Sequence, residues 1–174
     1  MKPALSLIAA LAFVLSACGG SSSDSSSSIP GLKSDTNVAL LSRGASASSS
    51  HNSSDANNLI DDNNNTYWTS ASGQKIVVDF GSVEKIKSIK LTRQAASAAI
   101  GSNPDILIEL STNGSNYTAS NLSVVTGGIA CTNLTTSITT MSCTMAERDT
   151  RYIRITSQNG RAYDFIELEA LATK

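Results

Sequence analysis

The stretch KIVVDFGSVEKIKSIKL, residues 75–91, decides the fold class. Its first half is the compact apolar run IVVDF (76–80), which is closed by Gly81. Its second half places isoleucine and leucine between lysines after the charged pair Glu84 and Lys85. Short runs rich in β-branched residues and bounded by glycine or charged turns are typical of β-strands. We therefore expect two strands here, separated by a turn.

Three further segments carry the same signals. Residues 106–110 alternate and then meet the turn sequence STNG (111–114), whose Asn-Gly pair tolerates positive φ. Residues 151–155 alternate large polar and apolar side chains with period two, and residues 165–171 form a last strand interleaved with glutamates. No amphipathic helix is evident. Short strands separated by Gly, Asn and Ser turns predict an all-β sandwich.

The N-terminus is typical of an export signal. Residues 1–17 hold one early lysine and an apolar run that is too short for a membrane-spanning helix. They end in LSA before Cys18, which resembles a bacterial lipobox and implies cleavage and lipidation at Cys18; an ordinary signal peptide is the alternative. Gly19 after that cysteine implies the outer membrane or cell surface. Residues 18–35 are serine-rich and predict a flexible linker, which leaves residues 36–174 as the domain.

The net charge and the cysteine count limit the partners and the cysteine chemistry that the chain can have. The chain has 13 basic and 14 acidic residues and a net charge of −1, which argues against a nucleic-acid partner. Once Cys18 is assigned to lipid, Cys131 and Cys143 remain as a pair in an exported chain, which predicts a disulfide between them. A metal site built on cysteine and histidine is the weaker alternative, because His51 is the sole histidine.

An ordered set of segments covers nearly the whole mature domain. The segments are NVAL (37–40), ASASS (45–49), NLIDDNNNTYW (58–68), IVVDFG (76–81), IELSTNG (108–114), RYIRI (151–155) and ELE (167–169). In this order they resemble the discoidin, or coagulation-factor type C, family. The resemblance implies a galactose-binding-like jelly-roll β-sandwich, whose bacterial members often recognise glycans through loops at one end.

The loop 58–68 is dense in Asp and Asn, which suits a hard cation such as calcium. In the resembling family such a loop encloses a structural calcium ion together with the first glutamate of the last strand. The implied ligands are the Leu59 carbonyl, Asp61, Asn63, Thr66 and Glu167. This chain departs from the family in having Asp62 and Asn63 where glycine and aspartate are usual. The alternative is a loop of Asx turns without an ion.

Candidate ligand contacts come from the resemblance and from side-chain chemistry. Arg93 and Gln94 stand where relatives often aim an arginine at sugar hydroxyls, and an arginine fork offers several donors. Asn103 is a further candidate, while Tyr117, Arg161 and Tyr163 either join such a site or decorate turns. His51, in a serine-asparagine loop, either hydrogen-bonds a hydroxylated ligand or stays solvated.

Trp68 is the sole tryptophan and offers two interpretations, a sugar-stacking platform or a core residue. We expect the core position, because a small domain rarely leaves so large a side chain exposed. Sugar-binding relatives commonly place a histidine just after this tryptophan, whereas this chain has Thr69 and Ser70.

The sequence favours binding over catalysis. It has no Gly-x-Ser-x-Gly elbow and no histidine cluster that could hold a catalytic metal, so we expect no enzymatic activity. The predicted function is that of a membrane-anchored lipoprotein with a carbohydrate-binding or adhesion module. The alternative is an envelope scaffold or protein-interaction domain, since fold alone does not determine a ligand.

Overall fold

The computed structural model describes residues 35–94, 106–119, 129–131, 139–158 and 162–173. The predicted signal peptide, Cys18, the linker up to residue 34, Asn103 and Arg161 lie outside these residues. The described part contains nine strands: β1 (Asp35–Asn37), β2 (Ser46–Ser49), β3 (Trp68–Thr69), β4 (Lys75–Arg93), β5 (Ile106–Ser111), β6 (Thr118–Ala119), β7 (Ile129–Cys131), β8 (Thr140–Ser157) and β9 (Asp164–Thr173). Two 3₁₀ helices, η1 (Leu41–Arg43) and η2 (Ser53–Leu59), complete it, and no helix among these residues is long and apolar enough to cross a membrane.

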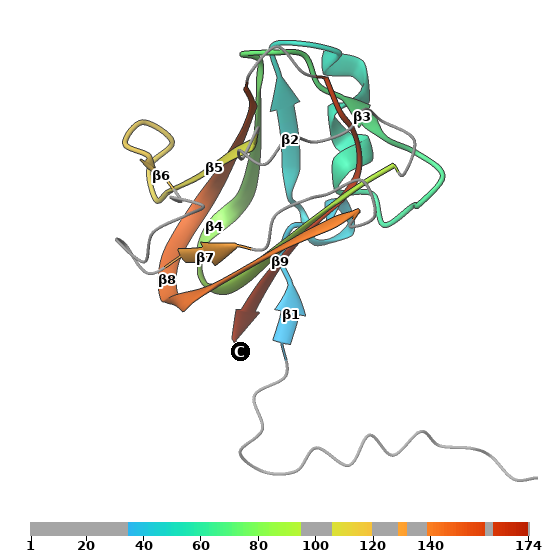
Figure 1. Ribbon diagram of the computed structural model, residues 1–174. Coiled ribbons are helices and arrows are strands. Elements are labelled where there is room, and N and C mark those ends of the chain that lie inside the picture. The colour runs from blue at the N-terminus through green and yellow to red at the C-terminus, as the bar shows by residue number, and fades with distance from the viewer. Residues whose placement is uncertain (1–34, 95–105, 120–128, 132–138, 159–161, 174) are drawn as a thin grey trace, which may run out of the picture. The chain divides into compact units, whose positions relative to one another are not determined.

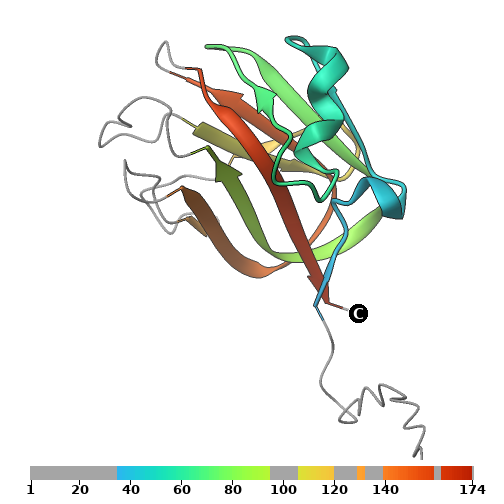
Figure 2. The same cartoon turned by 90° about the vertical axis from the view of Figure 1, so that its right-hand side faces the viewer.

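Two long antiparallel strands, β4 and β8, run through both layers of the sandwich (Figures 1 and 2). In one layer the first half of β4 pairs with β2 and with the end of β8, and β5 and β6 follow on the other side of β8. In the other layer the second half of β4 lies between β9 and the start of β8. The predicted all-β sandwich is confirmed.

The expectation of two separate strands in residues 75–91 is wrong in one respect. Both belong to the single strand β4, which changes layer through register shifts between Asp79 and Glu84 and between Ile86 and Ser88. Gly81 has a φ of +82°, a conformation that glycine adopts without steric cost. Irregularities of this kind bend a strand strongly, so its two halves can serve two layers without a break.

Among the described residues the hydrophobic core lies between the layers, and its buried members run from Ala39 to Ala172. Trp68 is fully buried, as expected, and its ring stacks on Phe165 with 6.1 Å between centroids. The compact unit spans Lys33–Lys174. Because this unit holds the core described above, a fragment of residues 35–174 is suited to measurements on the isolated domain.

Candidate functional site

One end of the sandwich is formed where β3 finishes, β4 finishes and β9 begins. The Ser70 N–H donates to the Tyr163 carbonyl at 2.8 Å, and the Tyr163 N–H donates to Ser70 Oγ at 2.8 Å. The Thr69 hydroxyl donates to Asp164 Oδ1 at 2.7 Å. These bonds join segments more than 90 residues apart in the chain. They hold the β3–β4–β9 end, which we define as residues 69–70, 93–94 and 163–164, in one arrangement.

Arg93 and Gln94 close β4 at this end. The Gln94 N–H donates to the Asp164 carbonyl at 2.9 Å, and the Arg93 guanidinium donates to the Gln94 carbonyl at 3.0 Å. Arg93 is only 1% exposed, whereas the Gln94 side chain is half-buried. The structure therefore places Gln94 at the surface of the β3–β4–β9 end and Arg93 beneath it. Their roles as ligand contacts stay predictions.

His51 reaches the same end through Trp68. The Trp68 indole N–H donates to the His51 carbonyl at 2.9 Å, and the Asn52 side chain donates to the Thr69 carbonyl at 3.0 Å. The loop that carries His51 is thus fixed beside β3. Tyr117 lies elsewhere, with the Arg154 guanidinium 3.8 Å from its ring centroid.

Sequence reasoning did not single out Thr69 or Asp164 as parts of a site. Both side chains are half-buried and polar, and they bond each other beside Gln94. The end of the sandwich thus presents an amide, a hydroxyl and a carboxylate, which together donate and accept hydrogen bonds. Such a set suits a hydroxylated ligand. No local pattern could reveal it, because Asp164 meets Thr69 only in the folded chain.

The acidic loop after η2 folds around Asp61. Thr66 Oγ1 lies 2.8 Å from Asp61 Oδ2 and 2.8 Å from the Asn63 carbonyl oxygen, and the Asn63 N–H donates to Asp61 Oδ1 at 3.1 Å. Asp62 has a φ of +60°, in the left-handed region that favours glycine and that Asp tolerates better than most residues. The loop therefore keeps a glycine-like turn at the position where the resembling family has glycine.

Glu167 of β9 contacts this loop, although it lies 105 residues after Asp62 in the sequence. Its Oε2 accepts the Asp62 N–H at 3.1 Å, while its Oε1 is buried without a hydrogen-bond partner. Burial raises the pKa of Glu167 from 4.5 to about 8; the Asp62 N–H opposes this rise, and the carboxylates of Asp61, Asp62 and Glu169 add to it. An ionised carboxylate in this position needs a cation to offset burial and repulsion.

These residues fit a calcium ion by their chemistry. Asp61 and Glu167 offer carboxylates, Thr66 and Asn63 offer neutral oxygens beside Asp61, and Leu59 ends η2 just before the loop. In the described part of the chain, no three His, Cys, Asp or Glu residues are grouped to hold a metal. A calcium site here would accordingly depend on hydroxyl and carbonyl oxygens as well as on the two carboxylates.

The two remaining cysteines are placed by strand register. Cys131 of β7 lies directly opposite Cys143 of β8 in the antiparallel pair. Directly opposed residues on antiparallel strands have Cα atoms about 4.5–5.5 Å apart, which suits a disulfide. The predicted disulfide stays a prediction that this register favours.

The architecture is that of a discoidin-like β-sandwich with the galactose-binding-like fold. The family model for the F5/8 type C domain matches residues 44–168. The chain belongs to this family, which is the discoidin family that the sequence resembles. A search of curated proteins finds no match.

Several solved structures share this fold. The domain CpGH89CBM32-6 of Clostridium perfringens is 18% identical with a TM-score of 0.62, and the match covers 79% of this chain and 99% of that one. The family 32 module of C. perfringens NanJ, solved with galactose, is 24% identical with a TM-score of 0.58 and the same two coverages. A mutant of chitosan-binding module 1 from a chitosanase/glucanase of Paenibacillus sp. IK-5 is 23% identical with a TM-score of 0.58, and the match covers 80% of this chain and 100% of that one. Likeness at this level of identity establishes the fold.

Proposed function

We propose that this domain is a non-catalytic carbohydrate-binding module whose ligand docks at the β3–β4–β9 end. The observation that carries the proposal is the convergence of Gln94, Thr69 and Asp164 at the surface of this end, above the buried Arg93. Amide, hydroxyl and carboxylate groups there can bond several sugar hydroxyls at once. Family membership and the named ligands of the similar modules, galactose and chitosan, support the same class of ligand.

Replacement of Gln94 by alanine tests this site. We expect Gln94→Ala to raise the Kd for a glycan about tenfold, because it removes a side chain that can donate and accept while the backbone bond from Gln94 to Asp164 remains. A glycan array would first select the ligand for the 35–174 fragment, and isothermal titration would then give Kd for the parent and the variant.

Thr144→Ala is the control for this test, since Thr144 is an exposed threonine in the first half of β8 and should leave Kd unchanged. A Kd in Gln94→Ala equal to that of the parent would place the ligand elsewhere. A folded domain that binds no glycan on the array would instead favour the scaffold or protein-interaction alternative.

We further propose that the chain is an exported lipoprotein held at the cell surface through Cys18. Replacement of Cys18 by serine should abolish incorporation of a fatty acid, because the thiol that accepts the lipid is lost while the domain is unchanged. Metabolic labelling of cells that express the full chain with a fatty acid measures this. Ser16→Thr, which keeps Cys18, is the control and should retain the label. Cys18→Ser protein that still incorporates the fatty acid would contradict the anchor.

We also propose a structural calcium ion in the acidic loop, held by Asp61, Asn63, Thr66, Glu167 and the carbonyl of Leu59. The support comes from the unpartnered buried oxygen of Glu167 and the oxygens grouped about Asp61. When bound, calcium would supply the positive charge that two neighbouring carboxylates need. Its position between η2 and β9 suits a role in joining the loop to the last strand.

A further inference from the structure

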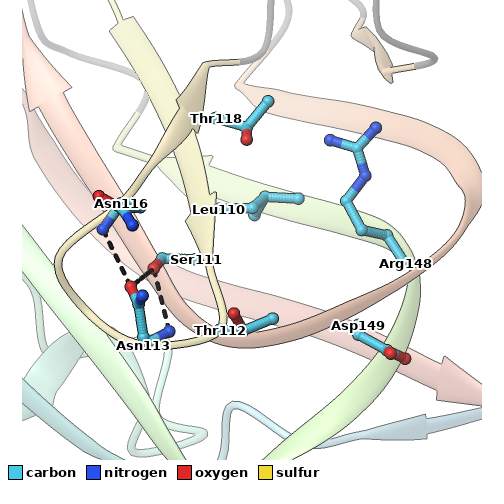
Figure 3. Close-up of a pocket in the computed structure, with 8 residues that line it drawn as sticks. All are labelled: Leu110, Ser111, Thr112, Asn113, Asn116, Thr118, Arg148 and Asp149. Atoms are coloured by element: carbon cyan, nitrogen blue, oxygen red, sulfur yellow. Dashed lines mark hydrogen bonds between the residues drawn. The ribbon is translucent and has the colours of Figure 1, made fainter.

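A hollow lined by other residues lies outside the β3–β4–β9 end. It has a volume of about 280 Å³ and opens between the β5–β6 hairpin and the bend of β8 (Figure 3). Leu110 forms its floor, Asn113, Asn116 and Thr118 come from the hairpin, and Arg148 and Asp149 come from β8. Thr140 of β8 pairs with Thr92, which is next to Arg93. Arg148 lies eight residues further along β8, a length of roughly 25 Å measured along the strand. We call this hollow the β5–β6 pocket.

The hairpin side of the β5–β6 pocket is held rigid by its own side chains. Asn113 Oδ1 accepts the N–H groups of Ser115 at 3.0 Å and Asn116 at 2.9 Å. Ser111 Oγ accepts the N–H groups of Asn113 at 3.2 Å and Gly114 at 3.0 Å. Gly114 has a φ of +73°, and a Cβ there would lie 3.4 Å from the Tyr152 ring. The loop is thus preorganised, so a ligand would not have to order it.

Several polar side-chain groups around the pocket have no hydrogen-bond partner within the described residues and could bind a ligand. Among the residues that the structure describes, the side chains of Thr112, Asn116 and Thr118 make no hydrogen bond, and they line the pocket. Asp149 uses only Oδ1, which accepts from Lys85 Nζ at 3.0 Å, and its Oδ2 has no partner within the described ranges. Figure 3 shows these side chains around Leu110, with Arg148 on the opposite wall from Asn116.

The chemistry of the lining selects the ligand class. An apolar ligand would leave amides and hydroxyls without partners, which is costly. An anion would meet Asp149 and a cation would meet Arg148, because the two charges stand side by side on β8. A neutral ligand with many hydroxyls can use the donors and acceptors together and lay its C–H groups on Leu110. The volume is near the lower end of ligand pockets, about 300 Å³, which suits one sugar residue.

We propose that the β5–β6 pocket is a second binding site, for a single neutral sugar residue. The site is built from its own residues and does not require the β3–β4–β9 end to bind anything. A chain with two sites on separate parts of the sandwich could engage two points of one polysaccharide, which raises avidity without new contacts.

Nuclear magnetic resonance titration of the 35–174 fragment tests the proposal. The probes are methyl β-galactoside, methyl α-mannoside, N-acetylglucosamine and glucuronate, each added up to millimolar concentration. We expect at least one neutral sugar to shift the side-chain amide signals of Asn113 and Asn116 and the backbone signal of Thr118. In Asn116→Ala and Thr118→Val we expect the Kd from these shifts to rise about tenfold, because each change removes a hydrogen-bonding group.

Controls separate this site from the first one. Thr144→Val changes an exposed strand threonine outside the pocket and should leave these shifts unaltered. Gln94→Ala should weaken shifts at the β3–β4–β9 end alone. Shifts confined to Gln94 and its neighbours would overturn the second site and leave the first. Pocket shifts caused by glucuronate alone, or unchanged in both pocket variants, would also overturn it. Pocket shifts without any at Gln94 would support the second site against the first.

Discussion

Replacement of Trp68 by alanine should lower the free energy of unfolding of the domain by about 3–5 kcal/mol. Trp68 is fully buried, stacks on Phe165, and donates its indole N–H to the His51 carbonyl. The variant would lose the buried surface of the ring, leave a cavity between the layers and release the loop that carries His51. Urea unfolding followed by circular dichroism gives this value, since the sole tryptophan is no longer present as a fluorescent probe.

Tyr67 offers a matched control for this loss. It is the neighbouring aromatic residue but is 42% exposed, so Tyr67→Ala should change stability by less than about 1 kcal/mol. If Trp68→Ala costs less than Tyr67→Ala and instead abolishes glycan binding, the tryptophan is a ligand platform and its packing in the core is not what stabilises the fold.

Removal of the proposed calcium ion should have the second largest effect on the free energy of unfolding. With calcium at about 100 times its Kd, linkage predicts about 2.7 kcal/mol of stability that chelator removes. Glu167→Gln and Thr66→Val should abolish this difference, because each removes a proposed ligand atom while the side-chain shape is kept. Thermal melting of the 35–174 fragment in calcium and in chelator measures it.

Glu169→Gln is the control within the same strand, since Glu169 lies two residues further along β9 and pairs with Lys90 at 3.3 Å. It should keep the full response to calcium. A melting temperature of the parent that is equal in calcium and in chelator would leave the acidic loop as a set of Asx turns.

Without calcium, the stability of the domain should also depend on pH, through the ionisation of Glu167. Its pKa is about 8 in the folded chain against 4.5 ordinarily, so the folded state holds a proton that the unfolded state has already lost. The associated stability is complete below pH 4.5 and is lost as pH rises toward 8. In chelator, the parent should therefore melt at a lower temperature at about pH 8.5 than at about pH 5.5, and Glu167→Gln should show a smaller difference. An equal difference in both proteins would assign the pH dependence to other groups.

The sequence predicted the grouping of residues in the acidic loop but not the arrangement of the β3–β4–β9 end. Asp61, Asn63 and Thr66 lie close together in the chain, so their grouping followed from loop composition and family resemblance. The Asp164–Thr69 bond joins residues 95 apart, and no local pattern indicates it. The burial of Arg93 beneath Gln94 was equally hidden, because an arginine at a strand end has the same sequence pattern whether it is exposed or covered.

The sequence by itself determined the class of fold, the family and the place of Trp68 in the core. The fold class follows from alternation along single strands and the family from the order of segments, while the core position of Trp68 follows from the size of its side chain. Only the tertiary structure decided that one strand, β4, serves both layers, that Arg93 is buried beneath Gln94, and that β5, β6 and β8 enclose a polar pocket. The physical reason is that register and burial are set by packing between segments far apart in the chain, which local propensity does not encode.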